Sequence, residues 1–166
     1  MSKHSYIDPD LLAGLERLAQ ARGGFDVATD LKNVRQASEA RDDALVSQLS
    51  VPEGTAQETL SITSRDGHII DLRIYRPTAV CDPLPIFYWM HGGGYVLGSA
   101  RQGDLFTLRA ASELGMFAVS VEYRLAPETP YPGPLEDCYE GLAHLVGNAG
   151  ALNLDTDKII IGGVSA

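Results

Sequence analysis

The sequence predicts an α/β fold, in which helices cover both faces of a central sheet. Three observations lead to this prediction. Short apolar runs typical of buried strands recur along the chain, at residues 85–90, 117–123 and 158–162. Segments with apolar residues at helical spacing lie between these runs. Because strands that alternate with helices usually run parallel, we expect a sheet that is parallel after a first antiparallel hairpin.

Two helices are expected before the first strand. Leucines at helical spacing predict the first helix within residues 8–24, with Asp8 as its N-cap and two glycines at its end. A weaker pattern with a polar middle predicts a second helix from about residue 30 to residue 49, stopping before Pro52.

The β pattern begins at about residue 58. Residues 59–63 and 69–75 flank Asp66-Gly67, a dipeptide typical of a hairpin turn. The elements expected next are a strand at 85–90, a helix at 105–114, a strand at 117–123, a helix that opens at 134 and a strand at 158–162. The residues expected on the inner faces of the two helices are Leu105, Leu108, Ala111 and Leu114 in the first and Leu142, Leu145 and Val146 in the second.

The end of the last strand carries a motif typical of a catalytic serine. Gly163-Val164-Ser165-Ala166 fills four places of G-x-S-x-G, the sharp turn between a strand and a helix that presents the nucleophile of a serine hydrolase. The sequence stops where the closing glycine would stand. Four matching residues occur by chance too often to decide a function, so the motif needs support from elsewhere in the chain.

A glycine-rich segment upstream gives that support. His91-Gly92-Gly93-Gly94-Tyr95 directly follows the strand at 85–90. Acyl transfer passes through an oxyanion, and glycines leave backbone N–H groups open to approach while permitting unusual backbone angles. We expect the N–H groups of Gly92 and Gly93 to form one side of an oxyanion hole and that of Ala166 the other.

A third motif lies between these two, Tyr123-Arg124-Leu125-Ala126-Pro127-Glu128, and a proline-rich stretch follows it. With its three motifs in this order, the chain resembles the hormone-sensitive-lipase-like esterases, a branch of the α/β-hydrolase superfamily. The resemblance implies the α/β-hydrolase fold, with residues 1–52 as a helical cap and residues 53–166 as the N-terminal part of the catalytic domain. It also implies a lipase-like serine esterase with Ser165 as nucleophile and an acyl-enzyme intermediate. The residues expected to support the loop are His91, Gly94, Tyr95 and Glu128.

Two features depart from the family pattern. Val164 stands where the residue before the serine is usually acidic, which leaves the geometry of the turn attainable. The triad acid and histidine of the family lie downstream of the serine, and we expect this chain to lack them. Two interpretations stay open: a part of a carboxylesterase whose isolated activity is very low, or an inactive truncated hydrolase that acts at most as a binding or interaction module. An open edge on the strand at 158–162 predicts pairing, either in a homo-oligomer or with a complementary C-terminal fragment.

The histidines and glycines have simpler interpretations as well. A histidine beside the oxyanion donors is better placed to hold the loop by a structural hydrogen bond than to take a proton from Ser165, and we expect that role for His91. His4, His68 and His144 fall on a tail, a turn and a helix, where solvation or packing is expected. The glycine run could also cradle a phosphate, but no dinucleotide-binding or Walker pattern surrounds it.

Composition and charge exclude several classes of function. The net charge of −9 argues against a nucleic-acid-binding surface. Cys81 and Cys138 match no metal-binding spacing and no disulfide framework, so we expect no metal, no cofactor and a cytoplasmic location. No run reaches the roughly 18 apolar residues of a membrane span, and the N-terminus lacks the apolar region of a signal peptide. The expected ligand is a small-molecule ester, whose identity the sequence leaves open.

Overall fold

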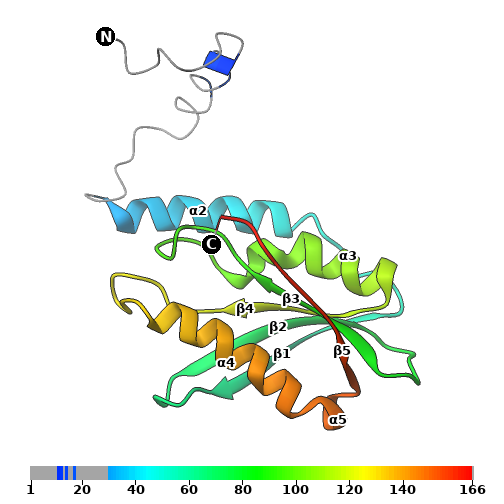
Figure 1. Cartoon of the computed structure of the whole chain (residues 1–166). Helices are drawn as coiled ribbons and strands as arrows, with labels where there is room; N and C mark the ends of the chain where they lie inside the picture. Colours follow the sequence, from blue (N-terminus) through cyan, green and yellow to red (C-terminus); the bar gives the residue numbers. More distant parts are fainter. Residues whose placement is uncertain (1–10, 13, 15–16, 18–29, 166) are drawn as a thin grey trace. The chain divides into compact units, whose positions relative to one another are not determined.

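The structure is a computed structural model that describes residues 11–12, 14, 17 and 30–165 (Figure 1). The chain divides into two compact units, residues 1–36 and 37–166. Helix α2 (Leu31–Val46) crosses this division, and its bounds confirm the weaker of the two predicted helices. Most of the first predicted helix, within residues 8–24, lies outside the described residues, as does Ala166.

The described part of the second unit contains one mixed sheet of five strands, in the order β1-β2-β4-β3-β5 (Figure 1). The hairpin of β1 and β2 is antiparallel, and β2 also pairs antiparallel with β4. Strand β3 pairs parallel with β4 on one side and with β5 on the other, so the predicted sheet is confirmed. The bounds are β1 Thr55–Thr63, β2 Ile69–Pro77, β3 Leu84–Met90, β4 Phe117–Glu122 and β5 Leu154–Gly163.

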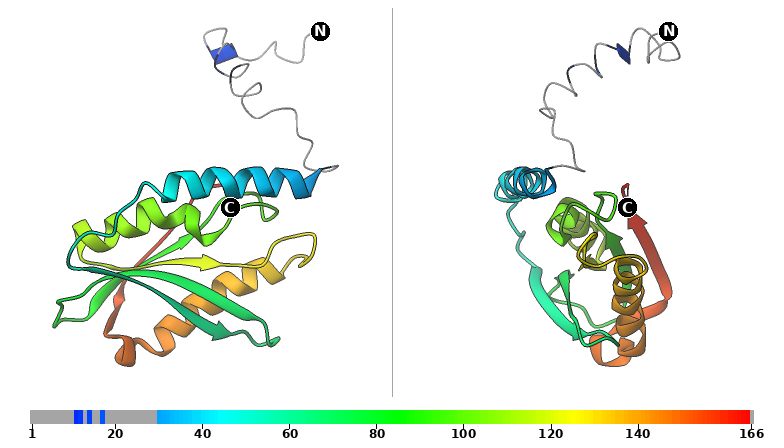
Figure 2. Two further views of the ribbon diagram at one scale, coloured as in Figure 1. Left: turned by 180° about the vertical axis from the view of Figure 1, so that it is seen from behind. Right: turned by 90° about the vertical axis from the view of Figure 1, so that its left-hand side faces the viewer.

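Helices cover both faces of the sheet, as predicted. A short 3-10 turn η1 (Ala100–Gly103) leads into α3 (Asp104–Leu114), which packs on one face (Figure 2). Helix α4 (Gly133–Gly147) lies on the other face and is followed by the short α5 (Ala149–Leu152). Side chains of β3 alternate between the two cores, because Phe87 packs beside α3 while Tyr88 packs in the core that includes α4.

The inner face of α3 differs from the predicted one. Leu108 is buried as expected, but Leu105 is 50% exposed and Leu114 is 71% exposed. The face that contacts the sheet runs through Asp104, Thr107, Leu108 and Ala111, which are all buried. Two of these buried residues, Asp104 and Thr107, are polar, so the apolar pattern predicted the wrong face of the helix as the buried one. In α4, Leu145 is buried as expected, whereas Val146 is 41% exposed.

Strand β5 is an edge strand in the part of the sheet that the structure describes. Its side chains Ile160 and Ile161 point to opposite faces of the sheet, and both are more than half exposed. None of the described helices is long and apolar enough to cross a membrane.

Candidate active site

Ser165 lies just after strand β5, at the carboxyl end of the parallel strands. The strand ends at Gly163, and the backbone turns at once, since Ser165 has a φ of 56°. This left-handed region is uncommon for residues other than glycine. A strained turn directly after a strand is the geometry in which serine hydrolases expose their nucleophile. Ser165 is exposed, as that role requires.

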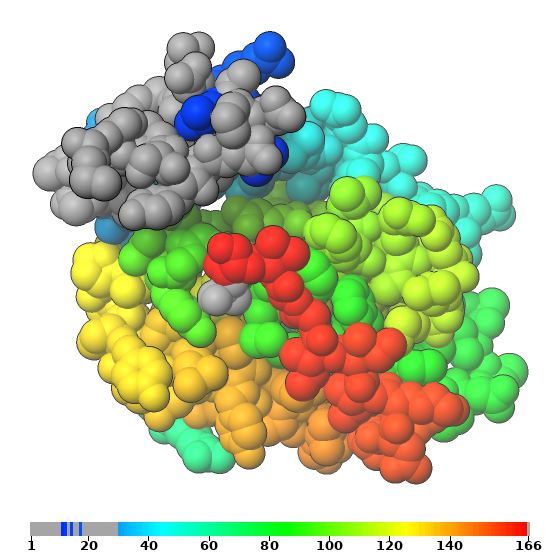
Figure 3. All heavy atoms as spheres, turned by 45° about the horizontal axis from the view of Figure 1, so that its top comes forward, coloured from blue at the N-terminus to red at the C-terminus, as the bar shows by residue number. Residues whose placement is uncertain are grey.

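The glycine loop meets this turn because β3 and β5 are parallel neighbours. Met90, the last residue of β3, is paired with Gly163, so the segments that follow both strands leave the same end of the sheet. The N–H groups of Gly93 and Gly94 each donate a hydrogen bond to the carbonyl oxygen of Ser165, at 3.3 Å. Figure 3 shows the red end of β5 lying against the green segment that contains the loop.

Close approach of the backbones explains two of the three glycines. A Cβ atom on Gly92 would overlap the carbonyl oxygen of Val164. A Cβ atom on Gly93, where φ is +127°, would overlap the carbonyl oxygen of Leu97. Any side chain at these two positions would therefore push the loop away from the turn or distort it.

His91 is fully buried at the start of the loop. Its Nδ1 lies 2.9 Å from the carbonyl oxygen of Gly92. Because a carbonyl only accepts, Nδ1 carries the proton in this contact. Burial lowers the pKa of His91, which favours the neutral ring. Its Nε2 has no hydrogen-bond partner among the described residues, and the ring stacks on Tyr123 with centroids 4.0 Å apart.

Tyr95 ends the glycine loop and joins it to the segment in which Glu128 lies. Tyr95 has a φ of 63°, and its carbonyl oxygen accepts a hydrogen bond from the N–H of Ala126 at 2.8 Å. This bond joins the glycine loop to the segment between β4 and α4. Glu128 lies further along that segment and is exposed.

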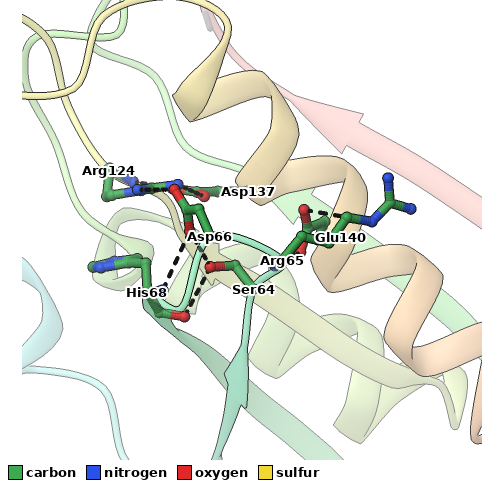
Figure 4. Close-up of polar contacts among 7 residues, drawn as sticks. All are labelled: Ser64, Arg65, Asp66, His68, Arg124, Asp137 and Glu140. Carbon is green, nitrogen blue, oxygen red and sulfur yellow. Dashed lines mark hydrogen bonds and ion pairs between the residues drawn. The ribbon is translucent and has the colours of Figure 1, made fainter.

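Sequence reasoning missed a polar cluster that holds the segment after β4 (Figure 4). Asp137, on α4, is 1% exposed and accepts three hydrogen bonds from Arg124, from the backbone N–H at 2.9 Å and from the side chain at 2.8 and 2.6 Å. Arg124 also donates to Asp66 in the hairpin turn at 2.7 Å. The hydrogen bond from the Ser64 hydroxyl, and after it the one from Arg124, holds the pKa of Asp66 well below its usual range. The sequence analysis did not identify this buried ion pair.

An apolar hollow of about 370 Å³ lies on the α3 side of the sheet. Phe87, Phe106 and Ile160 are among its lining residues, and neither the glycine loop nor Ser165 contributes to it. The described residues contain no group of three or more His, Cys, Asp or Glu side chains that could hold a metal ion.

Comparison with known proteins supports the fold and the family. A family described as having the alpha/beta hydrolase fold matches residues 87–166. An ethyl acetate hydrolase of Pseudomonas putida is 30% identical over 165 residues, which are 96% of this chain and 51% of that protein. A carboxylesterase of Mycobacterium tuberculosis is 39% identical over 97 residues, 58% of this chain and 30% of that protein.

Solved structures give the same result for the fold. A bacterial heroin esterase superposes with a TM-score of 0.80 at 38% identity, over 94% of this chain and 48% of that one. A hyperthermophilic esterase from the archaeon Pyrobaculum calidifontis superposes with a TM-score of 0.78 at 36% identity, over 94% of this chain and 49% of that one. The chain spans about half the length of these relatives, or less.

Proposed function

Because the chain belongs to the hormone-sensitive-lipase-like branch of the α/β-hydrolase family, we propose that it carries the nucleophile and the oxyanion donors of a carboxylic-ester hydrolase. In this proposal Ser165 attacks the carbonyl carbon of a small ester, the alcohol leaves, and water then releases the acid from the acyl-enzyme. The N–H groups of Gly92, Gly93 and Ala166 stabilise the oxyanion, and the geometry of the loop adds the N–H of Gly94 as a candidate donor.

The observation that best supports this function is the meeting of the glycine loop with the serine turn. Two N–H groups of the loop already point at one oxygen beside the nucleophile, at 3.3 Å each. In this structure that oxygen is the carbonyl of Ser165 itself. A substrate oxygen therefore has to replace the Ser165 carbonyl at Gly93 and Gly94 before the donors can stabilise a transition state.

The proposal also limits the activity of the chain by itself. Among the described residues, no histidine hydrogen-bonds to Ser165, and His91 uses Nδ1 on Gly92 while its ring is buried. Without a general base the serine hydroxyl is a weak nucleophile, and loss of a triad partner costs several orders of magnitude in kcat. We therefore expect hydrolysis of short-chain aryl esters only slightly above the buffer rate.

A chimera tests the proposal directly. The chain is joined to the C-terminal half of the bacterial heroin esterase, to which it is 38% identical, and hydrolysis of 4-nitrophenyl acetate is compared with that of the chain alone. We expect a gain of at least about 10³-fold, which Ser165→Ala abolishes. A folded chimera that hydrolyses no ester would favour the other interpretation, a binding module without catalysis. Fast, Ser165-dependent hydrolysis by the chain alone would show that it already contains a base.

A further inference from the structure

Tyr123, the last residue before the Arg124 cluster, contacts residues at both ends of the glycine run. Its hydroxyl donates a hydrogen bond to the carbonyl oxygen of His91 at 2.7 Å, and its ring stacks on the His91 imidazole with an interplanar angle of 4°. At the other end, its ring centroid lies 6.1 Å from that of Tyr95 in a tilted arrangement. Tyr123 is 2% exposed, and burial raises the pKa of its hydroxyl, which therefore stays a donor.

These contacts orient the amides of the loop, because a peptide unit is planar and trans. The carbonyl of His91 and the N–H of Gly92 belong to one such unit and point in opposite directions, so the Tyr123 hydroxyl fixes where the N–H of Gly92 points. The carbonyl of Gly92 and the N–H of Gly93 belong to the next unit. The His91 ring, stacked on Tyr123, bonds to that carbonyl and so fixes the N–H of Gly93.

Tyr123 is itself held in place by its neighbour in the chain. The backbone N–H and the guanidinium of Arg124 are bound to Asp137 on α4, and the guanidinium also reaches Asp66 in the hairpin turn (Figure 4). Arginine can bind one carboxylate through two of its nitrogens, which fixes orientation as well as distance. The position of Tyr123 therefore depends on α4 and on the β1–β2 hairpin, two elements outside the loop.

We propose that Tyr123 is the positioning residue of the oxyanion loop, acting through the carbonyl and the ring of His91 on the amides of Gly92 and Gly93. The role rests on the proposed esterase function, since these amides are the proposed donors. Tyr123 itself does not touch the reacting atoms, and its effect on the loop can be measured without turnover.

The test compares two tyrosines that each donate to a buried backbone carbonyl. Tyr123→Phe removes the hydroxyl that bonds to His91, and Tyr88→Phe removes one that bonds to Cys138 at 2.9 Å, away from the loop. Amide hydrogen exchange is followed by NMR on the full 166-residue chain. The bonds of Gly93 and Gly94 to the Ser165 carbonyl depend on how the whole loop is held, so we expect these two amides to exchange at least about tenfold faster in Tyr123→Phe than in Tyr88→Phe. The amide of Val119 in the core serves as the reference for global opening and should change equally in both variants.

Equal exchange at Gly93 and Gly94 in the two variants would overturn the proposal, because Tyr123 would then only fill the core. If Tyr123→Phe does not fold, the variant Arg124→Lys is measured instead. Lysine keeps the positive charge but cannot bind the Asp137 carboxylate through two nitrogens. The same two glycine amides should then exchange faster than in the wild type, and unchanged exchange would again refute the proposal. Failure of the chimera to hydrolyse esters would count against the proposed function and would leave the exchange result as it stands.

Discussion

The contact between Gly92 and Val164 makes a sharp prediction about how closely the glycine loop and the serine turn must fit. In Gly92→Ala the new Cβ atom lies well inside 3.0 Å of the Val164 carbonyl oxygen, a separation that real Cβ atoms essentially never show. Both partners are parts of the backbone, so no flexible side chain can give way. The turn after β5 is exposed, and we expect it to detach from the loop rather than to unfold the sheet.

The size of the effect follows from the bonds that this detachment breaks. The N–H groups of Gly93 and Gly94 lose their hydrogen bonds to Ser165, each contributing about 0.5–1.5 kcal/mol. A total of about 1–3 kcal/mol corresponds to roughly five- to 150-fold faster exchange of these two amides. The free energy of unfolding measured in urea should fall by less than about 1 kcal/mol, because the sheet and both cores stay intact.

Gly94→Ala provides the matched control. Gly94 has a φ of +59°, so alanine there is strained by about 1–2 kcal/mol, but its Cβ atom would meet no atom of the described residues within 4 Å. The loop should therefore keep its contact with the turn, and the amide of Gly93 should stay protected. Equal loss of protection at Gly93 in the two alanine variants would refute the close fit and would indicate that backbone strain alone governs the loop.

Three further predictions test other parts of the molecule. Asp137→Asn leaves the guanidinium of Arg124 without its buried partner and should lower the free energy of unfolding by about 3–5 kcal/mol in urea titrations, whereas Asp66→Asn, at an exposed carboxylate, should have a much smaller effect. Burial lowers the pKa of His91 from 6.5, so the stability that the neutral ring contributes is complete above pH 6.5 and is lost as the pH falls below that value. The difference in unfolding free energy between the wild type and His91→Gln should therefore decrease below pH 6.5, with a slope of up to about 1.4 kcal/mol per pH unit. A difference that does not depend on pH would contradict this prediction. Burial raises the pKa of Cys138 to about 12, while Cys81 is exposed, so a thiol reagent at neutral pH should label only Cys81 in the native chain and both residues in denaturant.

The sequence was sufficient to predict that the two motifs lie close together. An apolar run followed by glycines at 92–94 and a second apolar run followed by Ser165 place both motifs at carboxyl ends of buried strands. In a parallel sheet these ends lie on one edge, so proximity follows once the two strands are neighbours. The register that pairs Met90 with Gly163 is set by tertiary packing. Because the apolar strands are short, only a few registers bury them, and this limits the choice.

The polar contacts that hold the site could not be predicted in the same way. Arg124 binds Asp137, 13 residues away, and Asp66, 58 residues away. Nothing in local spacing distinguishes such partners from solvated surface charges. Asp104 gives a similar case, since its pairing with Arg73 on β2 buries a carboxylate in the first turn of α3 and shifts the inner stripe of that helix away from the apolar residues. Buried ion pairs interrupt the apolar pattern from which burial is predicted.

Three consecutive glycines allow the loop to approach the serine turn closely, but they also raise the conformational entropy that the loop loses on folding. Folding costs each glycine about 0.5–1 kcal/mol more in conformational entropy than it would cost alanine, which amounts to roughly 1.5–3 kcal/mol for the run. The hydrogen bonds that oppose this cost include those from Tyr123 to His91, from His91 to Gly92 and from Ala126 to Tyr95, and each contributes about 0.5–1.5 kcal/mol. The entropy cost of the glycines is therefore comparable with the contribution of a few hydrogen bonds, so the order of the loop depends on them. Loss of any one of these bonds should therefore release the donor amides while leaving the sheet beneath them folded.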